Sequence, residues 1–147
     1  MIIWFTGQPG SGKTTLANRL VDKLWISYGD VVSLDGDDLR KYFPQSYDEV
    51  GRRANVLNAQ RIAEMLSNQS LLVIVSLVSP YRDMREDLKS RHKVLEVYLH
   101  TDEKRGKEHY FADGYEKPLH KYLDLDTGKL SIEECINEIE ETLSIYR

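Results

Sequence analysis

A glycine-rich segment near the start of the chain has the residue types and the spacing of a phosphate-binding loop. Residues 7–14 read GQPGSGKT and fit the pattern G-x-x-x-x-G-K-[ST]. Glycines let the backbone turn where a Cβ would obstruct, so that successive N–H groups point inward as an anion site at the start of a helix. Lys13 then places a positive charge on the β- and γ-phosphates of a nucleoside triphosphate, and Thr14 offers its hydroxyl to Mg²⁺. The residues that we predict to bind the triphosphate are Gly7, Gly10, Ser11, Gly12, Lys13, Thr14 and Thr15.

Three aspartates follow the second apolar run of the chain, which spans residues 31–34. Asp35, Asp37 and Asp38 come just after it, and in an open α/β sheet ligands bind at the edge where such strands end. Carboxylates beside a phosphate loop can hold hydrated Mg²⁺ and can accept a proton from an attacking hydroxyl. We therefore predict that Asp35, Asp37 and Lys13 are catalytic, and that Thr14, Asp35 and Asp37 bind the metal. A turn in which an aspartate caps a helix is the alternative interpretation.

The third apolar run, residues 71–78, has no acidic residue at its end, where many P-loop hydrolases place a Mg²⁺-binding aspartate. This pattern favours a small kinase over a motor ATPase. Arg82 and Arg85 follow the run at helical spacing. They either clamp phosphates or are solvated helix residues.

These residues need a scaffold that brings separate segments of the chain to one edge. Five short apolar runs stand out, at residues 2–5, 31–34, 71–78, 94–99 and 122–125. Each is separated from the next by enough chain for a helix, which is typical of βαβ units. The runs predict an α/β fold with a three-layer, doubly wound, mostly parallel five-stranded sheet of the P-loop NTPase, nucleotide kinase-like type. The run 71–78 is the most continuously apolar and is the best candidate for a central strand, with both faces covered.

Apolar spacing and capping signals predict three helices. Residues 13–24 carry a leucine at every fourth position. Ser131 opens a capping box with Glu134. The apolar stripe that follows consists of Ile132, Ile136, Ile139 and Leu143. In the helix at 52–66, Arg52 and Asn55 fall on the apolar face. Because an unpaired buried charge is expensive, they need a partner, either a neighbouring carboxylate or a bound anionic ligand.

Length and composition limit the class of protein. The 147 residues correspond to one domain spanning 1–147. The net charge of −4 argues against a nucleic-acid partner bound through bulk positive charge, and so against a kinase of nucleic-acid ends. The longest apolar run is far shorter than the roughly 20 residues that cross a bilayer, and the apolar opening precedes the first basic residue, unlike a secretory signal. A single cysteine, Cys135, suits a reducing compartment. We expect a cytoplasmic protein without a membrane partner.

Six motifs occur along the chain in the order in which they occur in a known family of kinases. They are residues 7–15, LDGD-x-LR at 34–40, R-x-x-N at 52–55, SPYR-x-x-R at 79–85, EVY at 96–98 and YE-x-P at 115–118. On these motifs the chain resembles the adenylylsulfate kinases over nearly its whole length. The resemblance implies a P-loop kinase that uses ATP and Mg²⁺ to phosphorylate the ribose 3′-hydroxyl of adenosine 5′-phosphosulfate, a small nucleotide-type substrate, usually as a homodimer.

The resemblance also implies roles for individual residues. Asp35 corresponds to the general base for the acceptor hydroxyl, with Asp37 supporting it or the metal. Ser79 occupies the position of a phosphoserine intermediate in some members. Because direct in-line transfer needs only positioning and charge stabilisation, we expect Ser79 to line the substrate site or to be structural instead. The residues predicted to bind the substrate are Arg40, Arg52, Asn55, Ser79 and Arg82.

Two departures from the family pattern concern the acceptor. The position before Arg52, usually an aspartate, is Gly51, and the lid at residues 100–114 has about half of the usual length. Arg105, Lys107 and Phe111 are candidates to replace the missing lid block, whereas charge density makes residues 102–108 a solvated loop by default. A short lid keeps the transfer machinery and removes acceptor recognition. Another nucleotide-linked acceptor, such as cytidine diphosphoramidate, therefore fits at least as well.

A nucleotide-dependent switch is a further alternative. Residues 48–51 read DEVG, which superficially resembles a GTPase D-x-x-G element, but the chain has no N-K-x-D motif for guanine.

Overall fold

The five predicted runs are strands in the computed structural model, which describes residues 1–146. The strands are β1 Ile2–Thr6, β2 Val31–Asp35, β3 Leu72–Ser76, β4 Val94–His100 and β5 Tyr122–Asp126. The helices are α1 Lys13–Tyr28, α2 Gly36–Tyr42, α3 Glu49–Ser67, α4 Arg82–Arg91 and α5 Ile132–Ile145, with a short 3₁₀ helix, η1, at Glu108–Tyr110. The strand boundaries agree with the sequence to within two residues, and α1 and α3 are longer than their apolar patterns indicated.

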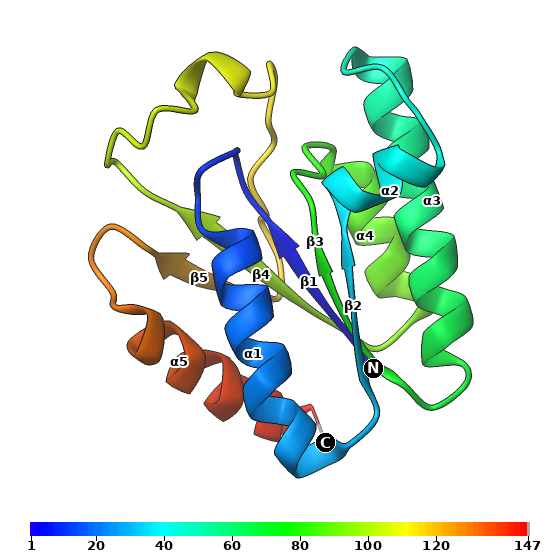
Figure 1. The fold of residues 1–147 in the computed structure, drawn as a ribbon, viewed down its shortest axis with the longest axis vertical. Helices are drawn as coiled ribbons and strands as arrows, with labels where there is room; N and C mark the ends of the chain where they lie inside the picture. The colour runs from blue at the N-terminus through cyan, green and yellow to red at the C-terminus, as the bar shows by residue number, and fades with distance from the viewer. Residues whose placement is uncertain (147) are drawn as a thin grey trace.

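The strands form one parallel sheet in the order β2-β3-β1-β4-β5. The strand β3 is an interior strand that is buried along its whole length, which confirms the prediction of a central strand with both faces covered. The strand β1, in the middle of the order, is buried in the same way. Because every pairing is parallel, the segments that follow β1, β2, β3 and β4 all leave from the same edge of the sheet (Figure 1).

Helices cover both faces of the sheet, which confirms the three-layer, doubly wound architecture. One face packs on α1 and α5, and the other on α3 and α4 (Figure 1). Alternate side chains of β1 point to opposite faces of the sheet. Ile3 and Phe5 pack in the hydrophobic core on the side of α1 and α5, and Ile2 and Trp4 pack in the core on the side of α3 and α4. Within residues 1–146 no helix is both long and apolar enough to span a membrane.

The capping signal at Ser131 correctly predicts the start of α5. The Ser131 side chain accepts a hydrogen bond from the backbone N–H of Glu134, and the Glu134 side chain accepts one from the backbone of Ser131. Cys135 and the three later members of the apolar stripe are buried, whereas Ile132, the first residue of the helix, is 42% exposed.

A buried group of charges connects β4 to α4 and to the chain that precedes β5. Arg85 donates from Nε to Oε2 of Glu96 at 2.7 Å, and both side chains are 1% exposed. Lys89 donates to the other oxygen of Glu96 at 2.6 Å. Arg85 also donates to the carbonyls of Ser79 and Glu116. Arg85 is therefore neither a phosphate clamp nor a solvated helix residue, because its partner lies on the neighbouring strand.

Candidate active site

The glycines of the phosphate loop occupy backbone conformations that favour glycine. Gly7 and Gly12 have φ values of 157° and 104°. A Cβ on Gly7 would lie 2.4 Å from the carbonyl oxygen of Leu99 and 2.7 Å from Oγ of Ser11. The loop therefore lies directly against the end of β4, and α1 begins at Lys13 immediately after it. The backbone N–H groups of such a loop at the start of a helix suit an anion.

Lys13 folds back over the loop. Its ammonium group donates to the carbonyls of Gly7 at 2.9 Å and Gln8 at 3.0 Å. Loss of solvation on burial lowers the pKa of Lys13 to about 8, although the carboxylates of Asp35 and Asp37 act in the opposite direction. A polyphosphate in the loop would offset that loss with its own negative charge, so the site fits the tail of a nucleoside triphosphate.

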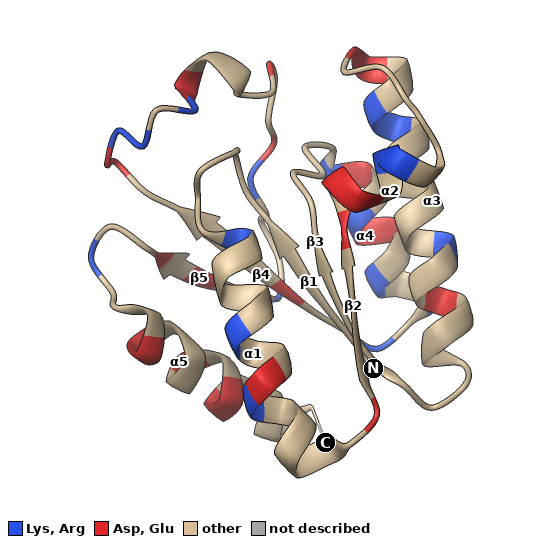
Figure 2. Cartoon of the chain, in the orientation of Figure 1, with Lys and Arg blue, Asp and Glu red and all other residues tan. Residues whose placement is uncertain are grey.

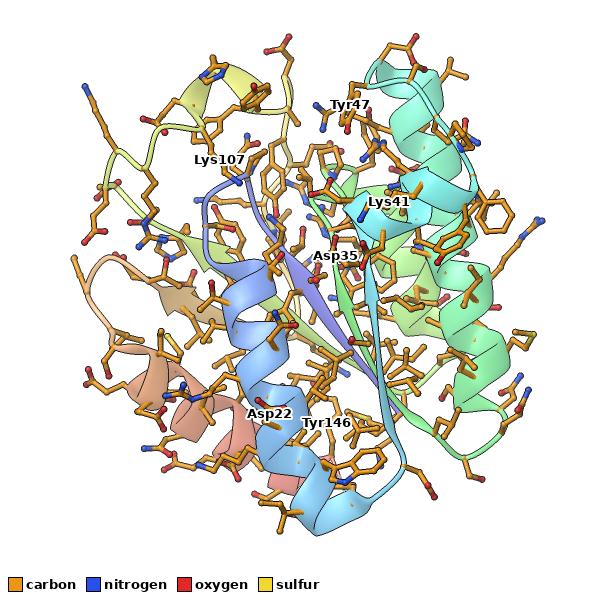
Figure 3. The ribbon with its side chains drawn as sticks, in the orientation of Figure 1. Asp22, Asp35, Lys41, Tyr47, Lys107 and Tyr146 are labelled. Atoms are coloured by element: carbon orange, nitrogen blue, oxygen red, sulfur yellow. The ribbon has the colours of Figure 1, made fainter. Side chains whose placement is uncertain are left out.

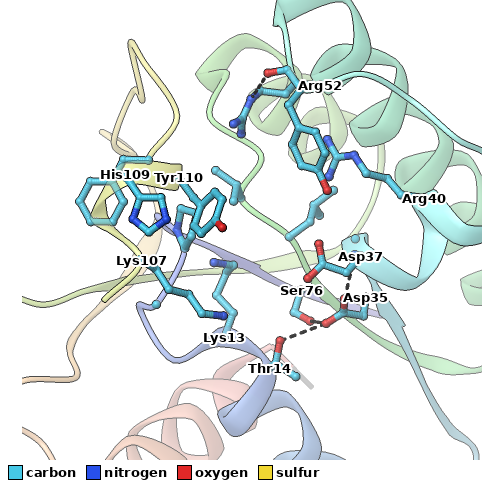
Figure 4. Close-up of a pocket in the computed structure, with 17 residues that line it drawn as sticks. Lys13, Thr14, Asp35, Asp37, Arg40, Arg52, Ser76, Lys107, His109 and Tyr110 are labelled. Carbon is cyan, nitrogen blue, oxygen red and sulfur yellow. Dashed lines mark hydrogen bonds between the residues drawn. The ribbon is translucent and has the colours of Figure 1, made fainter. Parts of the chain in front are cut away.

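Three donors fix the carboxylate of Asp35 (Figure 4). Its Oδ1 accepts from the backbone N–H of Asp37 at 2.8 Å and so caps α2. Its Oδ2 accepts from the hydroxyls of Thr14 at 3.0 Å and Ser76 at 3.3 Å. Asp35 is thus a helix cap and a pocket residue at once, and Asp37 lines the same pocket. The two interpretations of the sequence do not exclude each other.

The oxygens of Thr14 and Asp35 suit Mg²⁺. This cation is commonly held by one or two carboxylates together with substrate phosphates and water. Across residues 1–146 no cluster of three or more histidine, cysteine or acidic side chains could hold a metal. The oxygens of Thr14 and Asp35 fit a metal that binds together with substrate phosphates, as Mg²⁺ commonly does.

A cavity of about 630 Å³ opens above these groups, which is within the usual range for a small-molecule site. Lys13, Thr14 and Asp35 lie on its floor (Figure 4). Its two walls face each other across the cavity: Tyr47 lies on the side of α2 and α3, and Lys107 on the side of the lid (Figure 3). The first wall comprises Arg40, Tyr47 and Arg52, and the second Lys107, His109, Tyr110 and Phe111. Figure 2 shows basic residues on both sides of this end of the molecule.

The predicted substrate contacts on α2 and α3 lie together. The guanidinium of Arg40 lies 4.1 Å from the ring centre of Tyr47, and Arg52 donates from Nε to the carbonyl of Tyr47 at 2.7 Å. Asn55 is 2% exposed, and its amide nitrogen donates to the carbonyl of Gly36 at 3.4 Å. Within the described part of the chain, Oδ1 of Asn55 and Nε of Arg40 are buried without a hydrogen-bond partner. Both residues line a side cavity of about 20 Å³. Such orphaned groups carry a cost that a ligand or a water can remove.

Ser79 and Arg82 do not line the main pocket. The Ser79 hydroxyl accepts from the Trp4 indole at 2.9 Å and is buried beside the side cavity. Arg82 donates from Nε to the carbonyl of Lys117 at 2.9 Å, because the first turn of α4 directs it toward the chain before β5. Arg82 is therefore not among the residues that line the cavity, and its role as a substrate contact stays a prediction.

The lid candidates have different positions. Lys107 and Phe111 line the pocket, whereas Arg105 donates to the carbonyl of Gly10 in the phosphate loop at 2.9 Å. Residues 102–108 are exposed, as their charge density indicated. Two of these exposed residues, Arg105 and Lys107, nevertheless contact the phosphate loop or line the pocket. His109 and Tyr110 were not predicted, because no pattern marks them in the sequence.

Tyr47 was also missed, and Gly51 is the signal that points to it. A Cβ at position 51 would lie 2.1 Å from the carbonyl oxygen of Ser46. Glycine therefore lets the 46–48 turn fold against the start of α3, where Asp48 accepts from the backbone N–H of Gly51 at 2.9 Å. Asp48, the first residue of the DEVG segment, is the N-cap of α3. The turn at this position places the ring of Tyr47 against Arg40 and Arg52.

A parallel sheet, a glycine-rich loop ending in Lys13 and Thr14, and a carboxylate bonded to that threonine define a P-loop kinase of the nucleotide-kinase type. A sequence profile described as adenylylsulphate kinase matches residues 1–128. The chain belongs to the adenylylsulphate kinase family.

Individual relatives agree with this family and differ in their acceptors. An adenylyl-sulfate kinase from Chloroflexus aurantiacus is 32% identical over an alignment of 160 residues, gaps included. The alignment covers 95% of this chain and 86% of the relative. A cytidine diphosphoramidate kinase from Campylobacter jejuni is also 32% identical, over 161 residues, covering 98% and 92% of the two chains. The structure of the Mycobacterium tuberculosis APS kinase in complex with AMPPNP and APS is similar with a TM-score of 0.83 at 25% identity, covering 97% and 96%.

Proposed function

We propose that this protein transfers the γ-phosphoryl group of ATP to a hydroxyl of a small nucleotide-type acceptor, as an adenylylsulfate kinase does. One observation carries the proposal: Lys13 and the bonded pair Thr14 and Asp35 form the floor of a cavity whose walls carry two arginines and several aromatic rings. The floor suits phosphates and a metal, and the walls suit a base and an anionic tail.

The chain's own groups supply most of the chemistry. The backbone N–H groups of the loop and Lys13 hold the triphosphate, and Thr14 and Asp35 would hold Mg²⁺, which when bound neutralises phosphate charge. Asp35 accepts the proton of the acceptor hydroxyl, with Asp37 beside it as support. Three donors already orient the Asp35 carboxylate, so the base needs no rearrangement to face the cavity.

Adenylylsulfate is the first candidate for the acceptor. Arg40 and Arg52 line the wall near the predicted base, and guanidinium groups pair well with phosphate and sulfate oxygens. Such an anion would also give the orphaned Nε of Arg40 an acceptor. Loss of solvation on burial lowers the pKa of Arg40. A bound anion would offset this desolvation cost.

A phosphoramidate-bearing nucleotide, such as cytidine diphosphoramidate, is the second candidate, and Asn55 favours it. The amide nitrogen of Asn55 donates to the Gly36 carbonyl. If the side-chain amide were flipped, its Oδ1 would face the Gly36 carbonyl oxygen with no hydrogen between them. The unpartnered Oδ1 therefore needs a donor. A phosphoramidate tail carries N–H groups, whereas a sulfate tail carries only acceptors.

The test is an assay of ADP release with ATP, Mg²⁺ and each candidate acceptor. Asp35→Asn should spare ATP binding and lower turnover by roughly 10²-fold or more, and Lys13→Ala should weaken ATP binding through lost charge. Asp38→Asn is the matched control, because the Asp38 carboxylate is exposed and pairs with Lys41 at 3.1 Å. If no acceptor raises ADP release above background, the proposed activity is wrong, and full activity in Asp35→Asn would show that the base is another residue.

The proposal includes a setting for the enzyme. A buried free thiol at Cys135 suits a reducing compartment, and a cytoplasmic location follows from the proposal. The homodimer implied by the family resemblance is the assembly that we propose. Light scattering after size-exclusion chromatography measures it.

A further inference from the structure

The wall of the pocket formed by the lid has little structure of its own. Between β4 and β5 the chain is irregular except for the three residues of η1, and residues 102–111 are exposed. This segment nevertheless brings four side chains to the cavity, from Lys107 to Phe111. An exposed segment without regular hydrogen bonds keeps such a position only if other groups hold it.

Gln8 holds the lid after these four residues. Its Oε1 accepts from the backbone N–H of Ala112 at 2.8 Å, and its Nε2 donates to the carbonyl of Ala112 at 3.1 Å. The backbone N–H and the backbone carbonyl of Ala112 are thus both paired with the side chain of Gln8. Ala112 is 5% exposed, although its neighbours on both sides are exposed.

Arg105 holds the lid before the same four residues. It donates to the carbonyls of Gly10 and Thr127, each at 2.9 Å. The hydroxyl of Thr127 donates in turn to the carbonyl of Ser11 at 2.7 Å. The two attachments therefore flank the wall residues, and both end on the phosphate loop.

Gln8 has a second connection, to the lysine that binds phosphate. Its backbone carbonyl accepts from the ammonium group of Lys13 at 3.0 Å. A phosphate that engages Lys13 would act on the group that holds the backbone of Gln8, and an acceptor against the lid would act on the Gln8 side chain. Gln8 therefore connects the phosphate-binding lysine to the lid.

We propose that Gln8 is a positioning residue that couples occupancy of the phosphate loop to the placement of the lid, so that bound ATP orders the acceptor wall. The proposal rests on the proposed function for its substrates, but the coupling is a property of the loop and the lid alone. Coupling of this kind is reciprocal, so the acceptor also tightens ATP binding.

Hydrogen exchange tests the coupling without any acceptor. In the wild-type protein, AMPPNP with Mg²⁺ should slow exchange of the amides in residues 105–112, and the Ala112 amide should be the most protected. Gln8→Ala should speed exchange at Ala112 by roughly tenfold and should abolish the response to AMPPNP, because two hydrogen bonds are lost. Gln8→Glu keeps an acceptor for the Ala112 N–H and sets an oxygen against the Ala112 carbonyl, so it should give the same loss of response with a smaller change in basal exchange.

The matched control is Gln69→Ala, an exposed glutamine in the turn before β3, which should behave as wild type. Sheet amides should exchange alike in all variants, which shows that the fold is intact. An AMPPNP response in Gln8→Ala as large as in the wild type would overturn the proposal, as would an Ala112 amide that is unprotected in the wild type.

A kinetic test uses whichever acceptor the assay identifies. Gln8→Ala should raise KM for that acceptor at saturating ATP by roughly tenfold. Because the coupling is reciprocal, KM for ATP at saturating acceptor should rise by a similar factor, whereas the Kd of AMPPNP measured without acceptor should stay within about twofold. A rise in that Kd as large as the rise in KM for the acceptor would mean that Gln8 only supports the phosphate loop, and the coupling would be refuted. Failure of every acceptor would remove the proposed function, whereas the exchange experiment would still decide the role of Gln8.

Discussion

Replacement of Glu96 by glutamine tests the buried charge group with almost no change in side-chain volume. Glu96 is the shared partner of Arg85 at 2.7 Å and Lys89 at 2.6 Å. Its side chain and that of Arg85 are each 1% exposed, so water cannot replace the lost charge. Glu96→Gln therefore leaves Arg85 without its counter-ion in the interior, whereas Lys89 keeps Glu86 at 2.9 Å.

The expected loss of stability is large. Removal of one partner from a buried ion pair costs about 3–5 kcal/mol, from a total free energy of unfolding of roughly 5–15 kcal/mol for a domain. For a chain of this length a loss of that size lowers Tm by roughly 10 °C. The salt bridge itself need not be worth this amount, because the cost arises from the buried charge of Arg85 that remains.

Urea denaturation followed by circular dichroism measures the loss. The control is Glu140→Gln, which removes the partner of Lys23 at 2.6 Å from a pair whose side chains are 34% and 42% exposed. That variant should lose at most about 1 kcal/mol. If Glu96→Gln loses no more than the control, the Arg85 group does not behave as a buried ion pair and the reasoning is refuted.

Two further predictions concern the site. The Lys13 pKa of about 8 lies below its ordinary value, and bound phosphate favours the charged form, so ATP affinity should fall as the pH rises above about 8 and binding should take up a proton there. Calorimetry in buffers of different ionisation enthalpy measures that uptake, and an affinity that is constant between about pH 7 and about pH 9 contradicts it. Gly51→Ala should cost about 1–3 kcal/mol despite the helix preference of alanine, because the new Cβ would lie 2.1 Å from the Ser46 carbonyl oxygen. It should also raise KM for the acceptor through Tyr47; a stabilised variant with normal kinetics would show that the turn adapts freely.

Local patterns in the sequence predict the fold and the phosphate loop well. Apolar runs locate all five strands, and the loop motif identifies the adjacent residues Lys13 and Thr14. The capping box at Ser131 is equally local. These features depend on neighbours along the chain, so the sequence contains nearly all of the information that they require.

Residues whose partners are distant in the sequence were harder to predict. Arg85 follows the third strand as a phosphate-binding arginine would, and only the packing of α4 against β4 pairs it with Glu96. Arg52 lies on the predicted helix face, but its partner is the carbonyl of Tyr47, which a turn fixes through Gly51. Gln8 stands at a position where the loop motif accepts any residue, so the motif carries no sign of its bond to the lid.

The attachment of the chain between the lid and β5 has a consequence for which substitutions this scaffold can accept. Side chains of the core, Arg85 and Lys89, donate to main-chain carbonyls of Glu116 and His120. Every residue type offers that carbonyl, so these two bonds do not depend on which side chains stand at positions 116 and 120. Both positions can therefore accept other residue types while the bonds to the core persist, whereas the lid itself depends on the side chain of Arg105.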